Sequence, residues 1–92
     1  ITDWREHWSD KTLSFYIVQL AGFGNGKPQP QPVGADDPWA ELQWAQFRVA
    51  TKLKFNSGLA VTNDIGEEKD IHPKNKQEVG RRLALQALVK DY

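Results

Sequence analysis

The sequence contains no cysteine, which excludes disulfides, a thiol nucleophile and cysteine-ligated zinc. It also has no excess of charge, because 12 Lys and Arg balance 12 Asp and Glu, whereas a nucleic-acid-binding domain normally carries a basic excess. No run approaches the roughly 18 apolar residues of a membrane span. The first four residues, Ile-Thr-Asp-Trp, have neither the basic region nor the apolar run of a signal peptide. We therefore expect neither a nucleic-acid nor a membrane partner.

Methionine is absent as well, including at position 1. We therefore expect a processed product or a piece of a longer protein. The 92 residues are one small domain at most, and we treat residues 1–92 as a single segment. The content of 39% hydrophobic and 26% charged residues is typical of a globular chain rather than a disordered one.

A short helix is expected first, over residues 2–10. Asp3 and Glu6 have capping-box spacing, in which side chains bind the free N–H groups of the first turn. Trp4 and Trp8 are four residues apart and share one helix face. We interpret both tryptophans as core residues.

Residues 13–20 and 59–62 are apolar without alternation, which predicts short strands covered on both faces. A helix is predicted to begin at Asp37-Pro38, where Asp can cap and Pro suits the first turn. Another is predicted from Asn75, followed by Glu78, to about Lys90. This order predicts an α/β fold with parallel strands and right-handed βαβ crossovers.

Two strands cannot bury both of their faces alone, so the pattern resembles the final third of a doubly wound domain. An open sheet edge invites pairing with another chain. We expect a missing partner chain, a swapped dimer or a larger homo-oligomeric assembly.

Each of the two longer helices has an apolar stripe that predicts a core-facing side. The first stripe consists of Leu42, Ala45, Val49 and Leu53, widened by Trp39, Trp44 and Phe47. The second consists of Val79, Leu83, Ala84, Ala87 and Leu88. Glu78 and Arg82 have the spacing of an ion pair on the last helix.

Ligands of open α/β sheets bind outside the carboxyl ends of the strands, where residues 21–37 and 64–74 form loops. Residues 21–37 include four glycines and three prolines, and we expect extended polyproline geometry for part of them. Their Gly22-x-Gly24-x-Gly26 pattern only weakly resembles a phosphate-binding turn, because no helix starts directly behind it.

Residues 64–74 contain His72 and four nearby acids. A histidine base needs one ring nitrogen oriented by a carboxylate, while the other takes the proton of a nucleophile. Asp70 and His72 could form such a pair, and they also fit a solvated surface pair. A metal site needs three or four converging ligands. The other histidine, His7, belongs to the first predicted helix, so we expect no metal.

Three stretches of this region resemble the C-terminal end of sialate O-acetylesterases, carbohydrate esterases of the SGNH-hydrolase superfamily. They are residues 64–66 (Asp-Ile-Gly), 70–76 (Asp-Ile-His-Pro-Lys-Asn-Lys) and 79–84 (Val-Gly-Arg-Arg-Leu-Ala). Residues 15–21, 39–42 and 45–46 agree in the same order. The resemblance implies a flavodoxin-like αβα fold, removal of O-acetyl groups from sialic acids, no cofactor, and a secreted or periplasmic location.

By this resemblance His72 is the base of a Ser-His-Asp site. The superfamily commonly ends in Asp-x-x-His, but Lys69 stands at the Asp position, so Asp70 is the expected orienting carboxylate and Asp64 the alternative. The family's Gly-x-Ser block precedes this region, and none of the serines here (Ser9, Ser14 and Ser57) has that context. The implied partners are an O-acetylated sialic acid or related acetylated sugar, and the remainder of the esterase domain.

Two other functions remain open. A carbohydrate-binding or interaction module would use Trp39 and Trp44 as exposed stacking platforms. A flavodoxin-like ligand-binding domain would use the glycine-rich loop.

Overall fold

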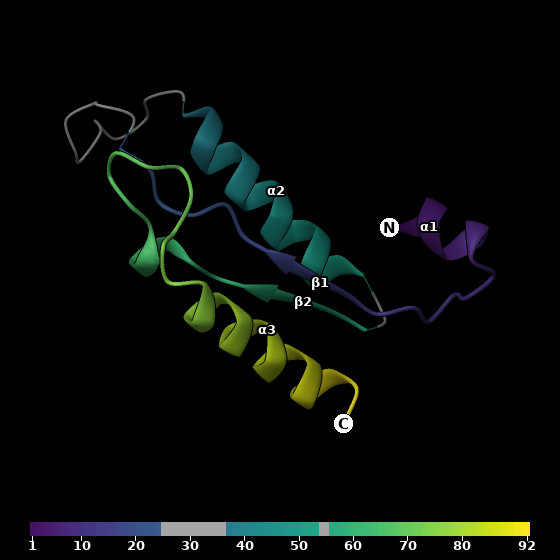
Figure 1. The fold of residues 1–92 in the computed structure, drawn as a ribbon. Helices are drawn as coiled ribbons and strands as arrows, with labels where there is room; N and C mark the ends of the chain where they lie inside the picture. Colours follow the sequence, from purple (N-terminus) through teal and green to yellow (C-terminus); the bar gives the residue numbers. More distant parts are fainter. Residues whose placement is uncertain (25–36, 54–55) are drawn as a thin grey trace.

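A computed structural model describes residues 1–24, 37–53 and 56–92. The elements are α1 (Thr2–His7), β1 (Phe15–Val18), α2 (Pro38–Lys52), β2 (Ser57–Ala60), the 3-10 turn η1 (Asn63–Ile65) and α3 (Lys76–Lys90) (Figure 1). The two strands are parallel, with Phe15 opposite Ser57 and Val18 opposite Ala60. The predicted α/β arrangement of two parallel strands and three helices is therefore confirmed.

The sheet lies between α2 and α3, whereas α1 lies apart, near the amino ends of the strands (Figure 1). The carboxyl ends of both strands point to the same end of the molecule, where residues 61–75 loop across before α3 begins. No helix in the described part of the chain is long and apolar enough to cross a membrane. The expected polyproline segment falls within residues 25–36, which lie outside the described residues.

Side chains cap the two longer helices as predicted. The Asp37 carboxylate accepts a hydrogen bond from the backbone N–H of Trp39 at 3.0 Å, and the Asn75 amide oxygen accepts one from that of Glu78 at 3.1 Å. Each bond satisfies one of the N–H groups that a helix start leaves without a partner.

The prediction for the first helix is wrong in three respects. The helix ends at His7, and its N-cap is Ile1, which makes no side-chain cap, because Asp3 already lies in the first turn. Trp4 and Trp8 contact each other edge to face at 5.9 Å between ring centroids, but both are exposed. The buried residue of α1 is instead Arg5, whose Nε donates to the Leu13 carbonyl at 2.9 Å.

The apolar stripe of α2 does not face the sheet. Leu42 and Val49 are 49% and 43% exposed, whereas the side toward β1 is largely polar. Gln43 Nε2 donates to the Leu20 carbonyl at 2.8 Å, and Gln46 Oε1 accepts from the Leu20 N–H at 2.8 Å. The backbone of β1 as it leaves the sheet needs these partners, which explains why amides occupy the inner face.

Other apolar positions are also less covered than predicted. Leu88 on α3 and Val18 on β1 are exposed, and among the described residues the buried hydrophobic ones are three alanines, Ala21, Ala50 and Ala60. β1 is shorter than expected, and β2 has the expected length but begins at Ser57 rather than at residue 59. Within the described ranges each strand pairs on one side only. The chain therefore presents apolar faces and strand edges that its own described residues do not cover.

Glycines allow the segments that follow the two strands to touch. A Cβ on Gly66 would clash with the carbonyl oxygen of Gly22 and lie 2.8 Å from the Gly22 nitrogen. The Gly24 N–H donates to the Glu68 carbonyl at 3.1 Å. The pattern that weakly resembled a phosphate-binding turn is thus explained, at Gly22 and Gly24, by backbone contact with residues 63–68.

We expect Gly66→Ala to destabilise the chain, because backbone atoms rather than a movable side chain meet the new methyl group. Overpacking of this kind typically costs about 1–3 kcal/mol. Chemical denaturation followed by circular dichroism measures the effect, with Gly80→Ala as the control, since a Cβ at Gly80 meets nothing within 4 Å. Equal loss of stability in both variants would contradict the close approach.

Candidate active site

We call residues 61–75 the His72 segment. It is anchored where it leaves β2, because the fully buried Thr62 donates its hydroxyl to the Gln19 carbonyl at 2.8 Å. Further along, Gly66 rests on Gly22. The segment therefore lies against the exit of β1, at the carboxyl end of both strands, where the sequence predicted the site.

Asp70 and His72 are brought together within this segment. Asp70 Oδ1 accepts a hydrogen bond from the His72 backbone N–H at 2.9 Å and lies 3.3 Å from His72 Nδ1. The bond from the His72 N–H, and secondarily its ring, lowers the pKa of the Asp70 carboxyl below its ordinary value. In the tautomer with the proton on Nδ1, the ring donates to Asp70 and leaves Nε2 able to accept a proton. The His72 side chain is 80% exposed.

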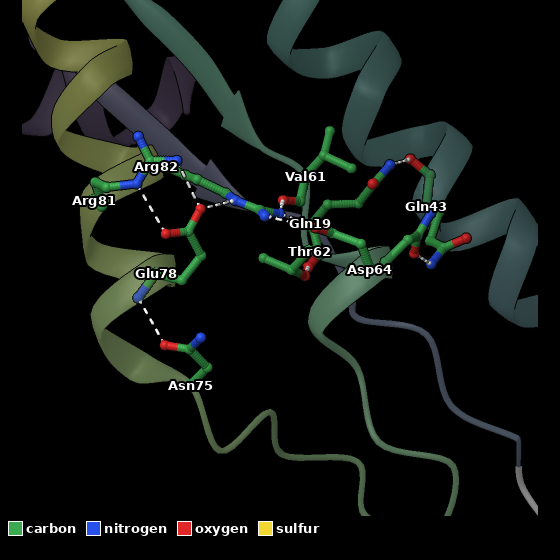
Figure 2. Close-up of polar contacts among 10 residues, drawn as sticks. Gln19, Gln43, Val61, Thr62, Asp64, Asn75, Glu78, Arg81 and Arg82 are labelled. Atoms are coloured by element: carbon green, nitrogen blue, oxygen red, sulfur yellow. Dashed lines mark hydrogen bonds and ion pairs between the residues drawn. The ribbon is translucent and has the colours of Figure 1, made fainter.

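Asp64, the alternative carboxylate, has a different partner. Its two oxygens accept hydrogen bonds from Nη1 and Nη2 of Arg82, both at 2.6 Å (Figure 2). These bonds lower the pKa of the Asp64 carboxyl from 3.8 to about 2. The geometry thus pairs His72 with Asp70, and Asp64 with α3.

Arg82 also binds two further groups. Its Nε donates to Glu78 Oε1 at 2.8 Å, which confirms the predicted pair, and its Nη1 donates to the Val61 carbonyl at 2.7 Å. We call Val61, Asp64, Glu78 and Arg82 the Arg82 cluster (Figure 2). Arg81 and then Arg82 lower the pKa of Glu78 from 4.5 to about 2. Sequence reasoning missed the Asp64–Arg82 pair, since the two residues are 18 apart and no local spacing relates them.

The two lowered pKa values predict acid sensitivity. A carboxyl whose pKa is depressed by folding stabilises the fold above its unfolded pKa, and this contribution is lost as the pH falls through the folded value. The Tm should therefore drop between about pH 4.5 and pH 2 in low salt, modestly because the carboxyls are solvent-accessible.

In Arg82→Gln the acid-dependent drop should be smaller, since both carboxyls lose that partner. Thermal melts across this pH range measure it, with Arg48→Gln on the exposed side of α2 as the control. Parallel profiles for the wild type and Arg82→Gln would contradict the assignment.

Among the described contacts, none joins His72 to any of the three serines. Ser57 begins β2, at the opposite end of the strand, and its buried hydroxyl donates to the Ala50 carbonyl at 2.9 Å. Ser14 precedes β1 and binds the Asp91 carboxylate. Ser9 lies between α1 and β1. Among the described residues no group of three His, Cys, Asp or Glu could hold a metal ion.

The two tryptophans of α2 differ in their availability. Trp39 is half-buried, donates Nε1–H to the Ala21 carbonyl at 2.8 Å and contacts Phe23. Trp44 is 59% exposed and stacks on Phe47 with 5.4 Å between the ring centroids. Of the two proposed platforms, only Trp44 presents an accessible ring.

The comparisons with known proteins relate the chain to one class of enzyme. No family model matches the sequence, and curated proteins give no significant match. Among solved structures, the chain is similar to a novel carbohydrate acetylesterase from Xanthomonas citri, with 45% identity and a TM-score of 0.80 over 94% of this chain. The chain spans 18% of that protein's length. This similarity supports relating the chain to a part of a carbohydrate esterase.

Proposed function

We propose that this chain is the C-terminal part of a carbohydrate esterase of the SGNH type, in which His72 is the base and Asp70 orients it. The observation that carries the proposal is the Asp70–His72 pair, with 3.3 Å between Asp70 Oδ1 and His72 Nδ1, in the segment that follows β2 of the parallel sheet. The similarity to the Xanthomonas citri acetylesterase supports the same reading. The serine nucleophile and the oxyanion donors belong to the remainder of the domain.

In this mechanism the serine oxygen attacks the carbonyl carbon of the acetyl ester while His72 Nε2 takes the hydroxyl proton. The imidazolium then gives that proton to the departing sugar oxygen. Water, deprotonated by the same nitrogen, attacks the acetyl-enzyme, and the imidazolium returns the proton to the departing serine oxygen as acetate leaves. Asp70 keeps Nδ1 as the donor and stabilises the positive ring.

We propose O-acetylated sialic acid as the substrate. The support is the Asp-Ile-His-Pro-Lys-Asn-Lys stretch at residues 70–76, which resembles sialate O-acetylesterases. In the intact enzyme containing this chain, acetate release should be faster from O-acetylated sialic acid than from acetylated xylo-oligosaccharides. The reverse order would retain the esterase and overturn the sialate assignment.

The role of the chain can be tested in a chimera, in which it replaces the equivalent segment of the Xanthomonas citri acetylesterase. We expect the chimera to hydrolyse 4-nitrophenyl acetate and the 92-residue chain alone to show no turnover above buffer. The reason is that the nucleophile and oxyanion donors supply most of the rate. Turnover by the isolated chain at the chimera's rate, or a folded chimera without activity, would contradict the proposal.

The second candidate, a sugar-binding module, is favoured by the exposed Trp44 ring alone. It predicts that sialic acid changes the tryptophan fluorescence of the isolated chain, and that Trp44→Ala abolishes the change. The esterase proposal predicts no such response.

A further inference from the structure

We propose that Arg82 is a positioning residue that holds the His72 segment in its working place, acting through Asp64. This inference rests on the proposed function for its catalytic consequence. The Arg82 side chain is only 21% exposed, although Asp64 itself is 62% exposed. Four hydrogen bonds of 2.6–2.8 Å leave its guanidinium: two to Asp64, one to Glu78 and one to the Val61 carbonyl (Figure 2).

The four bonds join the two ends of the His72 segment. Val61 and Asp64 lie where the chain leaves β2, whereas Glu78 lies in the first turn of α3, directly after the Asn75 cap. Asn75 binds the backbone N–H of Glu78, and the Glu78 carboxylate binds Arg82. One guanidinium thus ties the start of the segment to the point where it ends, and His72 lies between these two points.

The other described contacts that hold the His72 segment against the exit of β1 lie on the N-terminal side of His72. Gly66 rests on Gly22, and the Glu68 carbonyl accepts from Gly24. Downstream of Asp70, the described contacts reach α3 through the Asn75 cap and a bond from the Lys76 N–H to the Lys74 carbonyl. Without Arg82, α3 loses the side-chain hydrogen bonds that join it, among the described residues, to the exit of β2, and the His72 ring can shift relative to the sheet. A displacement of about 1 Å in a catalytic group can lower the rate by roughly 100-fold.

The geometry requires arginine rather than any cation. The planar guanidinium binds both oxygens of one carboxylate and still offers Nε to another, which a lysine ammonium cannot reproduce. Arg81, the neighbouring residue, bonds to Glu78 alone among the described residues, at 2.7 and 2.8 Å, and so provides a matched control. Both residues carry the same charge on the same turn of α3.

The catalytic consequence is tested in the chimera by comparing Arg82→Gln, Arg82→Lys and Arg81→Gln. We expect Arg82→Gln to lower kcat up to roughly 100-fold with KM changed little, Arg82→Lys to restore only part of the loss, and Arg81→Gln to stay near wild type. In the double variant, Asp64→Asn should lower kcat little beyond the loss caused by Arg82→Gln, because the two residues act as one unit. Active-site titration corrects each kcat for the folded fraction.

Equal losses of kcat in Arg82→Gln and Arg81→Gln would overturn the inference. So would a loss of kcat in Arg82→Gln that disappears once active-site titration has corrected for the folded fraction. If the inference fails while His72→Ala still abolishes turnover, the proposed function stands without it.

Hydrogen exchange in the 92-residue chain tests, independently of activity, whether Arg82 holds the His72 segment in place. Arg82→Gln should speed exchange at residues 62–72 and Arg81→Gln should not. Unchanged exchange in Arg82→Gln would overturn the inference even if the chimera were inactive.

Discussion

Replacing His72 with alanine is expected to lower kcat/KM of the esterase by at least about 10,000-fold, the largest effect of any substitution in this chain. In the proposed mechanism, its imidazole takes the proton from the nucleophile and returns it to the leaving group. The ring is 80% exposed in the isolated chain, and the described residues make no hydrogen bond to Nε2. A substitution there should therefore leave stability nearly unchanged.

The measurement is acetate release by the chimera, with His7→Ala as the control. His7 is the other histidine, and it is also exposed and close to an aspartate, with Nδ1 3.4 Å from Asp3 Oδ1. It lies on α1, near the opposite end of the strands from residues 61–75 (Figure 1). A folded His72→Ala chimera with near-normal turnover would overturn the assignment of the base.

The second large effect is expected at Asp70. Asp70→Asn should lower turnover strongly, toward the roughly 10,000-fold loss that the same change causes in serine proteases. The amide cannot hold Nδ1–H in the required tautomer as the carboxylate does. Asp64→Asn should cost far less, because both Asp64 oxygens are bound by Arg82 and its role is to hold the segment.

Both variants are to be compared in the chimera after thermal melts confirm folding. Asp64→Asn should lower the Tm more than Asp70→Asn, and Asp70→Asn should lower kcat more than Asp64→Asn. This crossed pattern separates an orienting carboxylate from a structural one. Loss of turnover in Asp64→Asn, with near-normal turnover in Asp70→Asn, would reverse the assignment.

The exposed apolar surfaces fit a chain that is part of a larger domain. The stripe of α2, with Leu42 and Val49 exposed, would be buried by further protein in a complete doubly wound fold. From this stripe we predicted that the apolar face of α2 packs on the sheet, whereas the face with Gln43 and Gln46 does. Amphipathicity indicates that a face is buried but does not indicate what buries it.

Three kinds of local feature were determined by the sequence alone: the caps of the two longer helices, the Asp70–His72 pair and the order of the elements. Asp37 and Asn75 cap their helices because a side chain and the N–H groups two or three residues ahead meet in any helix start. Asp70 and His72 meet because they are two residues apart in one turn. The order of strands and helices follows from hydrophobic runs and breakers, and it specified a parallel α/β arrangement.

The tertiary structure decided which distant residues touch. The contact between Gly22 and Gly66 and the bonds between Asp64 and Arg82 join residues 44 and 18 positions apart. Such contacts depend on how strands and helices pack, and no periodicity or spacing in the sequence encodes them. The same holds for the face of α2 that meets the sheet, which was decided by the backbone groups of Leu20 that needed partners.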